Sequence, residues 1–178
     1  MRAFDATPAG DLLAEFETQE VALFIDLVQQ IIGLLERVKE GEADVEPTVL
    51  ARLFPDAYTD DPSAADEFRR FTLDDLIDRK VENARGVLAS FDVAQARRTA
   101  DGEVRLVRLD REHAMYWLGT LTDLRLVLAT SLGIATVSDE GAVETPDAEY
   151  VESLYDWFGF AQGSLLEALE EVEGIGGS

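Results

Sequence analysis

The chain of 178 residues contains no cysteine and a single histidine, His113. Disulfide bonds, thiolate metal ligands and thiol-based redox switches are therefore excluded, and so is a metal site built from several histidines. Glycine-rich phosphate-binding loops and serine-elbow motifs are also absent from the sequence. We accordingly predict no catalytic residue, no metal site and no cofactor.

Basic residues are scarce, since 15 lysines and arginines stand against 37 acidic residues and give a net charge of −22. Nucleic acid and anionic membranes are poor partners for such a surface, because binding to phosphates depends on clustered lysine and arginine. No apolar run approaches the roughly 20 residues of a membrane span, and no signal-peptide pattern opens the sequence. We therefore expect a cytoplasmic protein without membrane contact.

Hydrophobic residues make up 47% of the chain, and their spacing predicts a mainly α-helical protein. The clearest helix runs from Asp110, a good N-cap, to Gly133, a good C-terminal cap. Because it is apolar over most of its circumference, we expect five to six helices in orthogonal or bundle-like packing around it. The other helices are predicted at residues 17–39, 47–53, 62–71, 72–91 and from residue 146 onward.

Residues 11–16 and 103–109 are predicted to be strands, and each is followed directly by a long apolar helix. This similarity indicates a weak internal repeat whose strands pair as a small two-stranded antiparallel ribbon, although amphipathic helices that follow strands give the same pattern by chance. Residues 92–102 are predicted to be a loop. We expect one domain at residues 11–173, with flexible ends at residues 1–10 and 174–178.

Several charged residues fall on helix faces that are otherwise apolar. Lys80 lies on such a face beside Asn83, and Asp123 and Arg125 lie in the most apolar part of the central helix. A buried charge needs a partner. Arg125 is therefore predicted to need a carboxylate, and Asp123 to need a donor such as Lys80 or the arginines at positions 69 and 70. Two interpretations stay open, a structural ion-pair network and a ligand-binding site.

Three further residues invite a prediction. His113 has no nucleophile near it in the sequence, which makes it a weak general base. Gln162 is predicted to be a hydrogen-bonded core amide. Gly33 costs its helix about 1 kcal/mol against alanine, which indicates either a close neighbour or no role. That helix carries apolar residues on two faces, as a homodimer would require and as ordinary burial would also explain.

Three blocks, residues 50–88, 117–134 and 155–169, resemble an actinobacterial family, the domain of unknown function numbered two thousand and seventeen. The resemblance implies a small cytoplasmic protein, often encoded beside the adaptor ClpS of the Clp protease. The family is also named as an actinomycete oxidative-stress regulator of transcription, a role tied to a cysteine pair that this chain lacks. The positions that match the family's motifs are Asp56, Tyr58, Arg69, Arg70, Lys80, Asn83, Asp123, Arg125, Asp156 and Trp157.

These observations lead to three functional hypotheses. The first is a non-enzymatic regulatory or adaptor protein that contacts a protein partner, for example from the proteolysis or transcription machinery. The second is a small anionic-ligand binding protein or enzyme that uses Arg69, Lys80, Asp123 and Arg125. The third is a transcriptional regulator of the stress response without a cysteine switch, for which the clustered basic candidates, all with acidic neighbours, are Arg97, Arg98, Arg105, Arg108 and Arg111.

Overall fold

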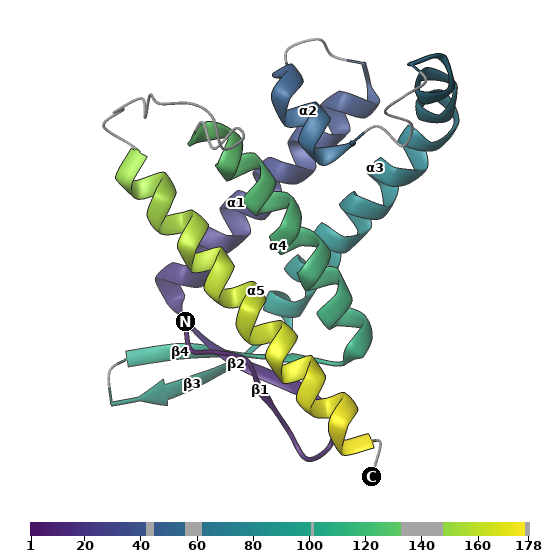
Figure 1. The fold of residues 1–178 in the computed structure, drawn as a ribbon. Coiled ribbons are helices and arrows are strands. Elements are labelled where there is room, and N and C mark those ends of the chain that lie inside the picture. The colour runs from purple at the N-terminus through teal and green to yellow at the C-terminus, as the bar shows by residue number, and fades with distance from the viewer. Residues whose placement is uncertain (42–44, 56–61, 101, 133–147, 177–178) are drawn as a thin grey trace.

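The computed structural model describes residues 1–41, 45–55, 62–100, 102–132 and 148–176, with the backbone alone described at 62–71 and 175–176. This part of the chain forms five helices and a four-stranded sheet (Figure 1). None of its helices has the length and apolar character that a membrane crossing requires. The elements in chain order are β1 (Asp5–Ala6), β2 (Leu12–Glu17), α1 (Thr18–Lys39), α2 (Pro47–Leu53), α3 (Pro62–Asp92), β3 (Gln95–Thr99), β4 (Gly102–Leu109), α4 (Arg111–Ser131) and α5 (Ala148–Gly176).

The predicted mainly α-helical fold is confirmed, but one helix boundary is wrong. Residues 62–71 and 72–91 were predicted as two helices because Thr72 and Asp75 resemble a capping box, whereas α3 is one continuous helix of 31 residues. No proline or glycine interrupts the chain at this junction. A capping sequence favours a helix start, yet it does not prevent the backbone from continuing a helix that has already formed.

The sheet is antiparallel in the order β1-β2-β4-β3. The two predicted strands do pair, with Ala14 opposite Val107, but the ribbon was predicted with two strands and the sheet has four. β3 was predicted to be a loop because it lacks apolar alternation, and four of its five residues are exposed. Its pairing with β4, which places Thr99 opposite Gly102, supplies the structure that its own side chains do not encode.

The first ten residues also differ from expectation, since part of them belongs to the sheet and the core. β1 pairs with β2, and Phe4 is buried beside Phe16 and Trp117. Burying an aromatic side chain stabilises the fold by roughly 1.5–3 kcal/mol. The packing of Phe4 is therefore a sufficient reason for this segment to join the domain that we predicted to begin at residue 11.

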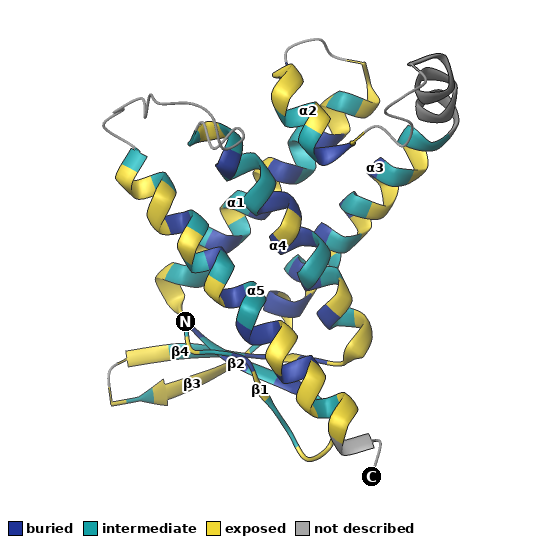
Figure 2. Ribbon diagram, viewed as in Figure 1, coloured by how far each residue is buried: buried dark blue, intermediate teal, exposed yellow. Residues whose placement is uncertain are grey.

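All helices lie on one side of the sheet, and buried residues occur both where the helices meet this face and where the helices pack on one another further from the sheet (Figures 1 and 2). Trp117 of α4 forms the centre of the core, with its ring centroid 5.0 Å from Phe24, 5.2 Å from Phe91 and 5.6 Å from Phe16. Its indole Nε1 donates to Ser90 Oγ at 3.2 Å. The core thus ties together α1, α3, α4 and β2.

The helix α4 begins where the sequence predicted, because the side chain of Asp110 accepts a hydrogen bond from the backbone N–H of His113. Gly133, the predicted C-terminal cap, lies outside the described residues. From this start α4 contacts each of the other four helices. Polar residues along α4 are therefore held against different neighbours on its different sides, which decides where the candidate site lies.

Candidate functional site

The predicted charged residues Lys80 and Asp123 meet at the contact between α3 and α4. Lys80 Nζ donates to Asp123 Oδ1 at 2.5 Å. The Asp123 side chain is only 4% exposed and that of Lys80 is 21% exposed. Lys80, one of the three donors predicted for Asp123, is therefore its partner in the structure.

Two glycines allow the helices to approach closely enough for this pair. A Cβ on Gly119 of α4 would lie 2.5 Å from the amide nitrogen of Asn83, and one on Gly86 of α3 would lie 2.4 Å from the ring of Tyr116. Neither distance is physically possible without a shift of the neighbour. Asn83, predicted to border the apolar face, thus sits directly against α4, one helical turn from Lys80.

Burial dominates the electrostatics of Asp123. Removal of the carboxylate from water raises its pKa, and the attraction and hydrogen bond of Lys80 oppose this rise without cancelling it. An unpaired carboxylate in this position would cost several kcal/mol. The ion pair with Lys80 therefore stabilises the negative charge of Asp123 in the interior of the protein.

An open groove of about 520 Å³ runs over this contact. Its apolar walls include Leu76, Leu118 and Met115, whose side chain is 53% exposed. Lys80 forms part of the groove and also lies 5.7 Å from the ring centroid of Phe54. The groove is therefore lined by exposed apolar side chains together with the Lys80–Asp123 ion pair, whose two charges neutralise each other.

Arg125 lies on the opposite side of α4 and faces α5, so it is not part of this groove. No carboxylate pairs with it among the described residues, in contrast to the prediction. Its Nη1 donates to Gln162 Oε1 at 2.8 Å, and its guanidinium lies 4.6 Å from the ring centroid of Tyr155. Its buried Nε has no hydrogen-bond partner in the described part of the chain. Gln162 also donates to Thr122 Oγ1 at 2.8 Å, which confirms it as a hydrogen-bonded amide between helices.

The remaining predicted positions do not join the groove in the described part of the chain. The side chains of Arg69 and Arg70 lie outside the described residues, and so do Asp56 and Tyr58. On α5, Trp157 packs against Phe24 and Phe158, with a buried Nε1 that has no hydrogen-bond partner, and Asp156 is exposed. The four-residue anion cluster of the second hypothesis is therefore not assembled, because Lys80 and Arg125 point to different neighbours.

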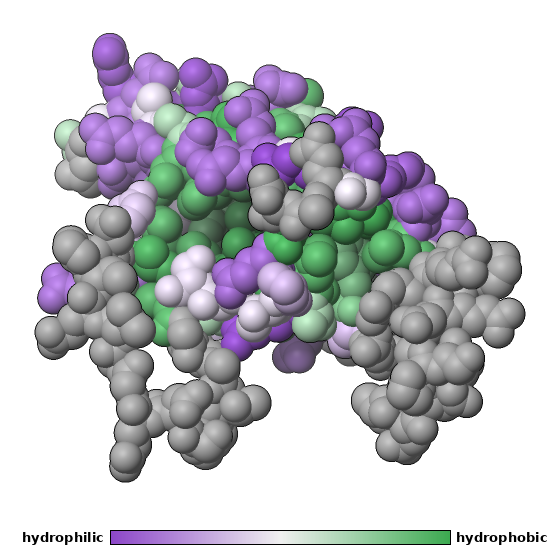
Figure 3. Space-filling model, turned by 90° about the horizontal axis from the view of Figure 1, so that it is seen from above, coloured by the Kyte–Doolittle hydropathy of each residue, from purple (hydrophilic) through white to green (hydrophobic). Residues whose placement is uncertain are grey.

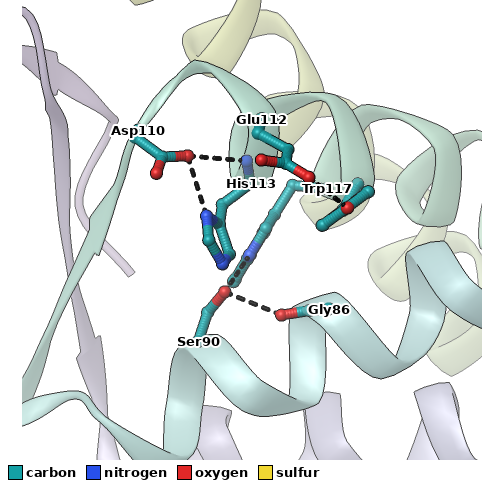
Figure 4. A network of polar contacts seen from close by, with 7 residues as sticks. Gly86, Ser90, Asp110, Glu112, His113 and Trp117 are labelled. Carbon is teal, nitrogen blue, oxygen red and sulfur yellow. Dashed lines mark hydrogen bonds and ion pairs between the residues drawn. The ribbon is translucent and has the colours of Figure 1, made fainter.

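Two separate sets of polar contacts are drawn at the start of α4, one between an aspartate and a histidine and the other around a buried serine (Figure 4). Asp110 Oδ1 lies 2.7 Å from His113 Nδ1. Ser90, which the sequence analysis missed, is buried, donates to Gly86 O at 2.9 Å and accepts from Trp117. Its hydroxyl is thus occupied by core contacts, whereas Asp110 and His113 form the N-cap of α4.

Several arginines in and beside the sheet are paired with carboxylates. Glu15 contacts Arg97 at 2.8 Å and Arg2 at 3.4 Å, Arg108 contacts Asp11 at 2.8 Å, and Arg111 contacts Glu173. Such pairing reduces the local positive charge that phosphate binding would need. Over the described ranges, no group of three or more acidic or histidine side chains could hold a metal ion.

Fold and site together define a small, mainly α-helical protein. Its helices lie on one face of an antiparallel sheet, and a lysine–aspartate ion pair lies at the base of an open groove between two of them. The chain belongs to the family described as a domain of unknown function, DUF2017, whose family model matches residues 1–169. This confirms the resemblance found in the sequence. No curated protein and no solved structure matches the chain.

Proposed function

We propose that this protein is a non-enzymatic regulatory or adaptor protein that acts through protein–protein contacts. The observation that carries the proposal is the groove between α3 and α4, in which Met115 is exposed above an ion pair that is already satisfied. Methionine adapts to partners of different shape and is frequent on binding surfaces. The partner would insert an apolar side chain between Met115 and Leu118.

The polar groups of the groove favour binding over chemistry. A general acid or base must reach the reacting atom and exchange its proton, whereas the Asp123 carboxylate is buried and bonded to Lys80. The positive charge of Lys80 is in turn neutralised by its ion pair with that carboxylate. Both residues therefore support the shape of the groove, and recognition is left to its apolar walls.

The charge of the chain defines the partner further. A net charge of −22 favours association with a protein that is basic around the inserted side chain, because electrostatic complementarity speeds encounter and selects among partners. The family resemblance adds a cytoplasmic setting and a partner from the proteolysis or transcription machinery to this proposal. A role in the stress response would then operate without a cysteine switch.

The test compares proteins captured from lysate of the source organism by three baits. They are the wild-type chain, Met115→Glu, and a control Val93→Glu at a site that is 77% exposed and not part of the groove. We expect at least one protein whose recovery falls about tenfold or more with M115E, as expected for a lost interface anchor, and stays unchanged with V93E. Equal recovery by all three baits, or no specific protein at all, would contradict the proposal.

A second candidate function is the binding of a small carboxylate or phosphate in the same groove. It is favoured by Arg79, which lines the groove and has no ion-pair partner in the described part of the chain. Titration with inorganic phosphate and with acetate, followed by amide chemical shifts, tests it. Saturable shifts at α3 and α4 that disappear in Arg79→Gln would support a ligand site; linear shifts at every concentration would reject it.

A further inference from the structure

A second groove opens between α1 and α4, away from the groove described above. The two helices cross, and their C-terminal halves diverge above the crossing (Figure 1). The space between them measures about 690 Å³, and its apolar lining comes from Leu27 and Leu34 of α1 and from Leu124, Val127 and Leu128 of α4. Viewed from above, hydrophobic side chains gather in a hollow with hydrophilic side chains around it (Figure 3).

Gly33 lines this groove in the middle of α1 and has no close neighbour among the described residues. A Cβ placed on Gly33 would meet none of their atoms within 4 Å. Glycine weakens a helix interior, and elsewhere in the chain Gly86 and Gly119 are explained by the close approach of a second helix. The open space beside Gly33 is therefore the kind of surface that a helix from outside the monomer could approach closely.

The charges along the groove are few and of opposite sign. Asp26 and Arg37 are the only charged residues of its lining, so the groove is neutral within a strongly acidic protein. Arg37 has no ion-pair partner among the described residues, and Asp26 accepts a hydrogen bond from Gln30 at 2.7 Å. The two residues are three helical turns apart and lie on the same side of α1.

We propose that the occupant of this groove is a second copy of the same chain, whose α1 packs antiparallel to the first in a twofold symmetric dimer. An antiparallel alignment that sets Asp26 opposite Arg37 of the second copy also sets Gln30 opposite Gly33 of the second copy. The twofold axis repeats both contacts. Two intersubunit ion pairs form, and each Gly33 leaves room for the facing Gln30.

The apolar contacts follow from the same arrangement. Leu27 and Leu34 lie on the side of α1 that is turned toward α4 in the groove. When the second α1 enters the groove, it covers these leucines together with Leu124, Val127 and Leu128, and the twofold axis repeats this burial, so that apolar surface is removed from water on both copies. A partner without the Asp26 and Arg37 spacing would bury the same leucines and leave both charges unpaired, which is why a second copy fits best.

This dimer is independent of the proposed function, because Met115 and Lys80 do not line the α1–α4 groove. The first experiment measures molar mass over a concentration series by sedimentation equilibrium for the wild type, Asp26→Arg, Arg37→Asp and the double variant. Each single reversal sets like charges opposite each other twice per dimer, so we expect the dissociation constant to rise about tenfold or more. The double variant exchanges the two charges and should restore dimerisation.

A second pair of variants separates close packing from folding. Gly33→Leu should dissociate the dimer while the monomer unfolds at a higher temperature, because leucine favours the helix and its Cβ would meet no described atom within 4 Å. Gly163→Leu on α5 is the matched control, since a Cβ there also meets nothing within 4 Å, and it should leave the dimer intact. Strictly monomeric wild-type protein would overturn the proposal, and so would a dimer that is indifferent to G33L and to both charge reversals.

Discussion

The two sides of α4 hold their charged residues in different ways. Toward α3, Asp123 is buried and receives a full opposite charge from Lys80. Toward α5, only two positions further along the helix, Arg125 is held by the amide of Gln162 and by the face of Tyr155. Both residues were predicted to require an ion pair, and among the described residues only Asp123 has one.

The difference follows from the chemistry of the two groups. A carboxylate is strongly hydrated and loses much free energy when it leaves water, so burial without a cation is expensive. A guanidinium is delocalised, more weakly hydrated, and able to stack on an aromatic ring while its N–H groups donate to a neutral acceptor. An arginine on an apolar face therefore predicts a hydrogen-bond acceptor or an aromatic ring as readily as it predicts a carboxylate.

The largest expected change in stability comes from breaking the ion pair between α3 and α4. Lys80→Met leaves the buried Asp123 without its cation, and we expect the free energy of unfolding to fall by about 3–5 kcal/mol. Chemical denaturation at neutral pH measures the loss. The double variant with Asp123→Leu removes both charges and should recover most of the stability; a double variant as unstable as Lys80→Met would show that the pair is not what Lys80 maintains.

A second comparison measures the effect on stability of replacing one glycine on α3 and one on α5, each of which packs against α4. Gly86→Ala drives a methyl group into the ring of Tyr116, at 2.4 Å, and should lower stability by about 1–3 kcal/mol. Gly159→Ala on α5 meets Arg125 at an ordinary 3.6 Å and should raise stability by up to about 1 kcal/mol through helix propensity. Thermal unfolding of the two variants side by side tests the expected opposite signs.

A smaller effect is expected when the α5 side loses its charge. Arg125→Met keeps most of the apolar length of the side chain and gives up the bond to Gln162 together with the stacking on Tyr155, so the loss should be about 1 kcal/mol. This is well below the loss expected for K80M in the same denaturation assay. A loss as large as that of K80M would mean that Arg125 has a charged partner outside the described residues.

The smallest effect is a difference in pH dependence between two carboxylates, that of Asp123 within α4 and that of its N-cap Asp110. Burial raises the pKa of Asp123 above its ordinary value of 3.8, so the stability linked to this group is present below that value and is lost as the pH rises through the raised pKa. Hydrogen bonds from His113 lower the pKa of Asp110. Its contribution is present above the ordinary value and is lost as the pH falls through the lowered pKa.

Urea denaturation over a pH series measures both, as wild type against Asp123→Asn and wild type against Asp110→Asn. The first difference should shrink as the pH rises above about 3.8, and the second should shrink as the pH falls below about 3.8, the ordinary pKa of an aspartate. Slopes of the same sign for both residues would contradict the opposite environments that the structure gives them.

Part of this site could be predicted from sequence, because the helical spacing of neighbouring residues shows which charged residues lie on apolar faces. The position of Lys80 on an apolar face required a buried contact, and Asp123 needed a donor in the same way. Residues far apart in the sequence decided the rest, because Gly86 and Gly119 matter only where α3 and α4 approach each other. Nothing near Ser90 in the sequence predicts that its hydroxyl accepts from Trp117.

Periodicity, capping chemistry and block similarity are properties of neighbouring residues, so they were enough to predict most helices, the pairing of β2 with β4, the N-cap at Asp110 and the family. The packing of distant segments was needed to establish that β1 and β3 complete the sheet, that α3 runs without a break, and that Asp123 and Arg125 face different helices. The reason is physical. A strand of exposed residues exists only through its partner strand, and the neighbour of a buried charge depends on how helices distant in sequence pack together.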